Sequence, residues 1–203
     1  PPYLTEASFE SRMKLIDLFD KKFRSRYRDR RVAAYTDLYS EATSLLTSGD
    51  LKAFDLNQEK SEVRDRYGRD LFGQGCLLAR RLIENQVRCV EVTFGGWDMH
   101  SALYDANALP SRCAIFDKAV SSLLQDLSAS GLLQETAIVI TTEFGRSPEI
   151  NYNAGRDHHP AAFSAVLAGA GFKTGQFYGK SDAAGHSVDS DGASPADLNA
   201  TVA

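Results

Sequence analysis

The sequence has little of what would place it in a specialised class of protein. Its 203 residues include only 3 cysteines and 6 prolines, with 43% hydrophobic and 25% charged residues. This composition excludes collagen-like, disulfide-stapled and disordered chains. No apolar run approaches the roughly 18 residues of a membrane-spanning helix. Lys and Arg number 23 against 27 Asp and Glu, so we expect a soluble fold with no nucleic-acid partner and no transmembrane segment.

The cysteines and the chain ends carry few functional signals. Cys76, Cys89 and Cys113 lie in apolar stretches without a metal or redox spacing, so we expect buried small side chains. The chain begins at Pro1 without a charged-then-apolar leader, and residues 194–203 look like a capped helix of about two turns. We therefore expect an internal fragment of a longer protein.

The first part of the sequence has the apolar spacing of amphipathic helices, which we expect between positions 9 and 46. Residues 21–31 interleave cations with aromatic side chains, as nucleic-acid-binding surfaces do. Because aspartates are interspersed, a solvated helix face is the favoured interpretation. Further helices are predicted at 59–67, 71–84 and 110–130.

Two β-branched segments flank the last of these helices. Residues 87–94 end in Gly95-Gly96, and residues 136–142 are typical of a strand covered on both faces. The strand–helix–strand order predicts parallel strands with their carboxyl ends at one sheet edge. A third strand is expected at 162–167. We predict an α/β fold, with a helical region over 1–66 and the α/β part over 67–203.

Carboxylates and imidazoles gather in three short segments, each at or after the end of a predicted strand. The candidate metal ligands are Asp98, His100, Glu143, Asp157, His158 and His159. Oxygen and nitrogen ligands together suit zinc, manganese or iron better than calcium or magnesium. Structural alternatives stay open, since Asp98 could cap a helix and Glu143 could pair with Arg146.

His158 and His159 cannot both easily serve one ion if their backbone is extended. Pro160 biases His159 toward extended backbone, and neighbouring side chains on such a backbone point to opposite sides. Asp157 and His159 repeat the Asp-x-His spacing of the first candidate segment. Spacing alone therefore makes His159 a candidate ligand.

Six segments form an ordered set, at 67–69, 76–84, 95–100, 142–148, 155–160 and 194–198. Together they resemble a bacterial sulfatase-like family, the domain of unknown function 1501, which is grouped with the alkaline phosphatase superfamily. The resemblance runs from Tyr67 to the end of the chain. It implies a doubly wound, mostly parallel α/β sheet, with one or two divalent metal ions at its carboxyl edge. It also suggests export or a periplasmic location.

The resemblance implies a metal-dependent hydrolase of sulfate or phosphate esters, with a small-molecule or polysaccharide substrate. Cations and an arginine stabilise the charge of such an ester group. Arg146 or Arg156 could hold the ester group bidentately, or could pair with the carboxylates instead. The family motif favours His158 over His159.

One departure from the superfamily pattern supports a second hypothesis. At the strand end where the superfamily has an Asp-His pair, this sequence has Glu143 followed by Phe144. The superfamily's nucleophile and its neighbouring Asp ligand lie upstream of the matched segments. The alternative function is a non-catalytic metal- or ligand-binding protein that retains the fold.

Overall fold

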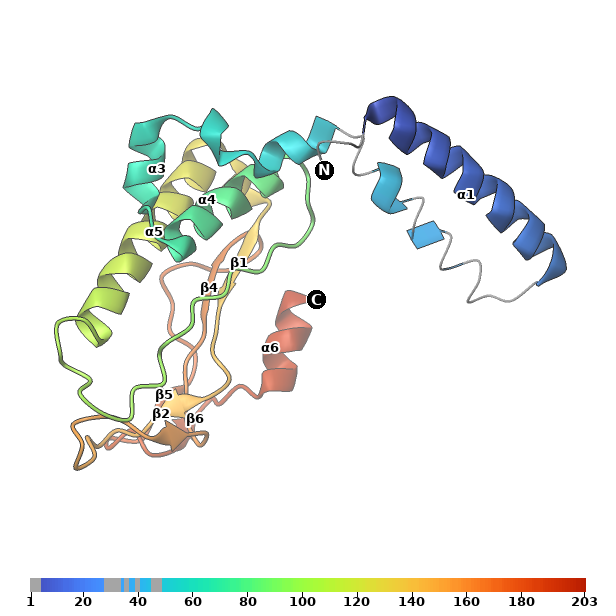
Figure 1. Ribbon diagram of the computed structural model, residues 1–203. Helices are drawn as coiled ribbons and strands as arrows, with labels where there is room; N and C mark the ends of the chain where they lie inside the picture. The colour runs from blue at the N-terminus through green and yellow to red at the C-terminus, as the bar shows by residue number, and fades with distance from the viewer. Residues whose placement is uncertain (1–4, 28–33, 35–36, 39–40, 45–48) are drawn as a thin grey trace. The chain divides into compact units, whose positions relative to one another are not determined.

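The computed structural model describes residues 5–27, 34, 37–38, 41–44 and 49–203. The chain forms two units, Pro1–Lys52 and Ala53–Ala203, which are drawn in Figure 1. In the first unit, helix α1 spans Glu6–Arg26, and the Thr5 hydroxyl caps it by accepting a hydrogen bond from the Ser8 backbone N–H. Among the described residues, no helix is long and apolar enough to cross a membrane.

The described part of the basic run lies at the end of α1, and residues 28–33 of the run are outside the described residues. Lys21 and Lys22 are exposed there, and the Lys21 ammonium pairs with Asp17 at 2.8 Å. This arrangement agrees with a solvated helix face.

Three helices build the core of the second unit at the positions that the apolar spacing predicts. They are α3 (Ser61–Tyr67), α4 (Leu71–Glu84) and α5 (Leu109–Ala129). Helix α4 begins where the Asp70 carboxylate accepts a hydrogen bond from the Gly73 backbone N–H. Leu77 of α4 and Ala119 of α5 are fully buried in one apolar cluster. Short 3-10 helices flank this core at η1 (Gly49–Phe54), η2 (Leu56–Gln58) and η3 (Leu132–Gln134).

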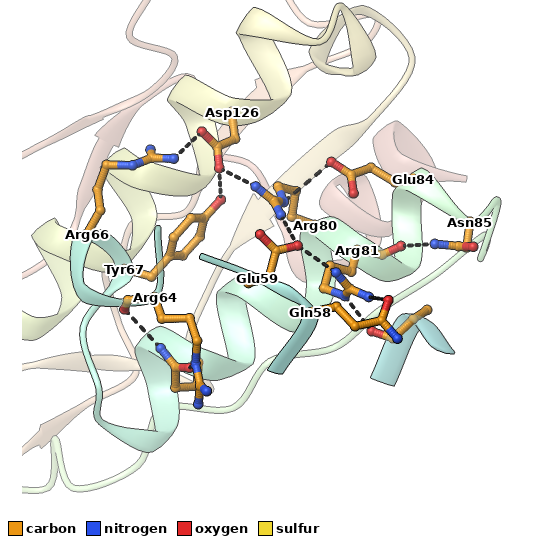
Figure 2. A network of polar contacts seen from close by, with 12 residues as sticks. Gln58, Glu59, Arg64, Arg66, Tyr67, Arg80, Arg81, Glu84, Asn85 and Asp126 are labelled. Atoms are coloured by element: carbon orange, nitrogen blue, oxygen red, sulfur yellow. Dashed lines mark hydrogen bonds and ion pairs between the residues drawn. The ribbon is translucent and has the colours of Figure 1, made fainter. Parts of the chain in front are cut away.

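A network of charged side chains ties these helices together (Figure 2). Asp126 of α5 accepts hydrogen bonds from the Tyr67 hydroxyl at 2.9 Å and from Arg80 at 2.8 Å. The same Arg80 guanidinium donates to Glu59 at 2.6 Å. Glu59 therefore belongs to the second unit, and the helical residues from Ala53 to 66 pack there rather than with the first unit. This division differs from the boundary that we expected after residue 66.

The strands of the second unit form three small antiparallel pairs. These are β1 (Ala137–Ile140) with β4 (Val166–Gly169), β2 (Gly145–Arg146) with β3 (His158–His159), and β5 (Lys180–Ser181) with β6 (Val188–Ser190). Figure 1 shows β1 and β4 in the middle of this unit, with α3 and α4 toward one end and β2, β5 and β6 at the other. Helix α6 (Pro195–Val202) begins at a capping box of Ser194 and Asp197. The fold is α/β-like, with no parallel ladder among the described residues.

The predicted parallel pairing of 87–94 with 136–142 is wrong for this structure. Strand β1 pairs with β4 in the antiparallel sense, and residues 87–94 run without a strand ladder. Their alternation has another cause, because Val90, Val92 and Phe94 are half-buried while Glu91 and Thr93 are exposed. Phe94 stacks on Phe72 of α4, with ring centroids 4.3 Å apart. The apolar period of two thus reflects packing on a helix rather than pairing with a strand.

The expectation of three buried cysteines holds for only one of them. Cys76 packs in the helical core with 3% of its surface exposed, and burial raises the pKa of its thiol to about 12. Cys89 and Cys113 are exposed. Their apolar neighbours in the sequence do not lead to burial of these two side chains. Cys89 precedes the half-buried part of its segment, and Cys113 lies on an outer side of α5.

Candidate metal centre

Two loops of the second unit, 97–103 and 151–157, meet through backbone hydrogen bonds. The Leu103 N–H donates to the Ala154 carbonyl at 2.8 Å, and the Arg156 N–H donates to the Met99 carbonyl at 3.0 Å. Gly155 fits between them because a Cβ at this position would collide with the backbone of His100. The close approach requires glycine, and it brings segments that are far apart in sequence to one place.

Asn151 braces the two loops from the inside. Its amide nitrogen donates to the His100 carbonyl and to the Asp157 carboxylate, each at 3.1 Å. Its side-chain oxygen accepts hydrogen bonds from the N–H groups of Asn153 and Gly155, each at 3.0 Å. This one side chain therefore fixes both the loop turn and the positions of two candidate residues.

The loops bring Asp98, His100 and His158 together. Asp98 Oδ1 lies 2.9 Å from His100 Nε2 and 2.8 Å from His158 Nε2. The two Nε2 atoms are 3.2 Å apart. These three atoms form a group that could hold a metal ion, and we call it the ligand cluster. All three side chains are about half exposed, so an ion has access from solvent.

Asp157 contacts the ligand cluster from behind. Its carboxylate lies 2.7 Å from His100 Nδ1, the ring nitrogen on the far side from Asp98. A carboxylate in this place fixes the ring orientation and directs the proton to Nδ1, as it does behind many metal-binding histidines. In a neutral His100 with its proton on Nδ1, the lone pair of Nε2 faces Asp98 Oδ1, which is the arrangement in which both atoms can bind one cation.

The electrostatics of the cluster follow from these contacts. Hydrogen bonds from His158 and then Arg146 lower the pKa of Asp98 to about 2. The hydrogen bond that His100 donates to Asp157, with the charges of both carboxylates, raises the pKa of His100. Hydrogen bonds from His100 and Asn151 lower the pKa of Asp157. The two carboxylates are thus ionised, and their charge favours a cation in the site.

The spacing of the cluster fits a tetrahedral transition-metal ion. Ligand atoms at about 2.0 Å from zinc lie about 3.3 Å from one another in a tetrahedron. The three separations of 2.8, 2.9 and 3.2 Å approach the edges of one face, so a small outward movement admits the ion. Two nitrogen ligands and one oxygen ligand also match the preference of zinc, whose catalytic sites use three protein ligands and keep the fourth position for water or substrate.

Arg146 and Phe144 form the wall beside the cluster. Arg146 Nη1 donates to Asp98 Oδ1 at 2.5 Å, the same oxygen that faces both histidines. The Phe144 ring lies against His158, with centroids 4.5 Å apart, and the Arg146 guanidinium lies 5.6 Å from the centre of the same ring. Phe144 therefore packs against a candidate ligand and a candidate anion-binding residue at once.

Other predicted site residues lie outside the cluster. Glu143 is exposed and is not part of the group of ligand atoms found among the described residues. His159 Nε2 lies 2.8 Å from the His186 carbonyl, whereas its neighbour in β3 faces Asp98. Arg156 donates to the carbonyls of Ser147 and Pro148 at 2.5 Å each, which braces a loop. Of the two arginines, Arg146 is the one that contacts a ligand-cluster residue.

The sequence reasoning did not identify Asn151 as part of the site. The residue lies outside the candidate segments, in a short run that has two asparagines and ends in Gly155. Such a run indicates a turn that an asparagine side chain stabilises, and this pattern could have identified Asn151 as a turn residue. Nothing in the run itself indicates that the turn holds His100, which lies far away in sequence.

The sequence matches the family model described as Protein of unknown function (DUF1501) over residues 1–203. The resemblance seen from Tyr67 onward is thus confirmed for this family, and it extends through the N-terminal residues. No curated protein and no solved structure matches the sequence.

Proposed function

The chain belongs to the DUF1501 family, and from the geometry of its ligand cluster we propose that it is a metal-dependent hydrolase of sulfate or phosphate esters. The observation that carries the proposal is the convergence of two imidazole nitrogens and one carboxylate oxygen within 3.2 Å of one another. Arg146 on the same carboxylate adds a group suited to an oxyanion.

The chemistry of the neighbouring residues favours ester hydrolysis over simple ion storage. A divalent ion in the cluster would supply Lewis-acid stabilisation of charge on an ester oxygen. Asp157 holds the His100 ring in the tautomer that a ligand requires. Arg146 offers a planar guanidinium, which matches the oxygens of a sulfate or phosphate group better than lysine does.

The choice of sulfate or phosphate esters, and of zinc or manganese as the ion, comes from the sulfatase-like resemblance and from the ligand types. We also propose that the chain belongs to the alkaline phosphatase superfamily. Its proposed substrate is a small-molecule or polysaccharide ester. One ion fits the ligand cluster, and Asp157 acts behind His100 rather than on the ion. Arg146 is the proposed ester-binding arginine, in preference to Arg156.

A non-catalytic metal-binding protein is the second candidate, and Phe144 is the observation that favours it. An apolar ring fills the place beside His158, so a second ion next to the first has no ligand there. A protein with one bound ion and no turnover would keep all the contacts of the cluster.

The test uses full-length protein that is stripped of metal with a chelator and reloaded with Zn²⁺ or Mn²⁺. We expect hydrolysis of an aryl sulfate or an aryl phosphate only after reloading, and loss of both ion and activity in Asp98→Ala. Glu143→Gln is the control, because this exposed carboxylate lies outside the cluster and its loss leaves activity in place. Ion binding without turnover of either ester supports the non-catalytic candidate, and absence of ion binding contradicts both.

A further inference from the structure

Helix α1 carries large apolar side chains that are exposed to solvent along one side of the helix. Steps of three and four residues place one group of side chains on a common face of a helix. We call this group the mixed face, and it consists of Leu15, Ile16, Phe19, Lys22, Phe23 and Arg26. Every one of these side chains is exposed, and Phe19 is 63% exposed. An apolar surface of this kind indicates a binding site.

The charges of α1 are divided between its faces. The acidic residues of the helix all lie outside the mixed face, at Glu6, Glu10, Asp17 and Asp20. Lys21 also lies on the acidic side, where its ammonium pairs with Asp17 at 2.8 Å. The mixed face itself has cations and no carboxylate, so it attracts an anionic surface. Because the chain as a whole has a net charge of -4, this attraction is local to the helix.

Aromatic rings and cations meet at the end of α1. The ring centroids of Phe23 and Tyr27 are 4.7 Å apart, and the Arg26 guanidinium lies 6.0 Å from the centre of the Tyr27 ring. Both rings are about half exposed. Tyrosine and long cationic side chains are typical of the boundary between the hydrocarbon and the head groups of a bilayer. The sequence continues with Arg28, Arg30 and Arg31, which add positive charge next to this end.

The aliphatic members of the mixed face favour a lipid surface over a nucleic acid. Leu15 and Ile16 offer neither a charge for a phosphate nor a ring on which a base could stack. A bilayer interface buries apolar side chains at the edge of the acyl chains, while Lys22 and Arg26 extend to the head groups. Both kinds of side chain on this face then have a partner.

We propose that α1 is an interfacial helix, whose mixed face binds a membrane surface that contains anionic lipids. Apolar burial and electrostatic attraction both contribute to such binding, so it requires both kinds of side chain. The mixed face belongs to the unit Pro1–Lys52 and the ligand cluster to the unit Ala53–Ala203. The inference is therefore independent of the proposed function.

The experiment is flotation of the full chain with two kinds of vesicle, phosphatidylcholine alone and phosphatidylcholine mixed with phosphatidylglycerol. We expect binding to the vesicles that contain the anionic lipid, little binding to phosphatidylcholine alone, and release at high salt. Phe19→Ser should lower the ratio of bound to free protein about tenfold, because it removes a large apolar side chain from the buried face.

Two neighbouring lysines provide the matched comparison. Lys22→Gln should lower the bound-to-free ratio about fivefold, which is the effect of one cation near an anionic surface. Lys21→Gln removes the same charge from the acidic side of the helix, and we expect nearly unchanged binding. Circular dichroism checks that each variant keeps its helices.

Three results overturn the inference. They are equal binding to both kinds of vesicle, equal losses in Lys21→Gln and Lys22→Gln, and full binding by Phe19→Ser. Binding of the chain to duplex DNA but not to vesicles overturns it as well, and assigns the mixed face to a nucleic acid.

Discussion

Gly155 is a residue at which the site depends on the absence of a side chain. A Cβ there would collide with the His100 backbone, so Gly155→Ala separates the two loops and disperses the ligand cluster. We expect a loss of Zn²⁺ affinity in a calorimetric titration. Gly95→Ala is the control, because a Cβ at Gly95 meets nothing nearby. Unchanged affinity in Gly155→Ala would show that the close approach is not needed.

Asp157 tests the positioning of His100. Asp157→Asn keeps the shape of the side chain but removes the charge that holds the Nδ1 proton. We expect the affinity for Zn²⁺ to fall by about 10–100-fold, as is usual for a partner behind a metal-binding histidine. The comparison is Glu149→Gln, since Glu149 pairs with His186 at 2.7 Å outside the cluster. An equal effect of the two substitutions would contradict the role of Asp157.

The sequence could predict the members of the cluster better than their roles. The Asp-x-His spacing indicated Asp98 and His100, and the family motif favoured His158 over His159 as a ligand. In the structure His158 is the one of the two that faces Asp98. The sequence could not assign Asp157 to His100 or Arg146 to Asp98. Those contacts join residues 57 and 48 positions apart in the chain, and they depend on how two loops meet.

At the scale of helices and strands, the ion network of α3, α4 and α5 makes a strong prediction. Asp126 has 17% of its side chain exposed and pairs with Arg66 and Arg80. Asp126→Ala removes this partner of Arg66, and it leaves Arg80 with Glu59 and Glu84 alone. We expect a loss of about 1–3 kcal/mol of unfolding free energy. Denaturant unfolding measures this loss. Asp65→Ala, which breaks the exposed pair with Arg69, should leave the midpoint nearly unchanged.

The same network predicts the acid sensitivity of the fold. Burial alone raises the pKa of Asp126 and of Glu59, but hydrogen bonds from the surrounding arginines outweigh burial and lower both. A lowered pKa means that the ionised form stabilises the folded state. This contribution is complete above the unfolded-state values near pH 4 and is lost as the pH falls through the folded values.

We therefore expect the melting temperature to fall between about pH 5 and pH 2, with a shallower fall in Asp126→Asn, which lacks one of these carboxylates. Circular dichroism at the helical band follows the transition. An identical pH profile for the wild type and Asp126→Asn would contradict the assignment.

The sequence predicted the helices and strand β1 (Ala137–Ile140), but not which segments pair as strands, and segment 87–94 shows the reason. The spacing of Leu77 and its neighbours on α4 depends on local geometry, so its period leads directly to a helix. A segment in which apolar and polar residues alternate indicates only that one of its two faces is buried. Val92 and Phe94 are covered by the helical core, and nothing local says whether a segment's backbone has a partner strand.

At the scale of the whole molecule, the site and its supporting core both lie in the unit Ala53–Ala203. We expect a variant that begins at Ala53 to keep the Zn²⁺ affinity of the full chain and its cooperative unfolding transition. Titration and thermal unfolding of both proteins provide the comparison. Weaker Zn²⁺ binding in the shortened protein would show that residues 1–52 contribute to the site.

The central claim is that Asp98, His100 and His158 hold one metal ion. Calorimetric titration of metal-free protein with Zn²⁺ tests it most directly, in the wild type, His158→Ala and His159→Ala. The account predicts one ion per chain in the wild type and in His159→Ala, and a large loss of affinity in His158→Ala. Equal Zn²⁺ binding by the two histidine variants would contradict it.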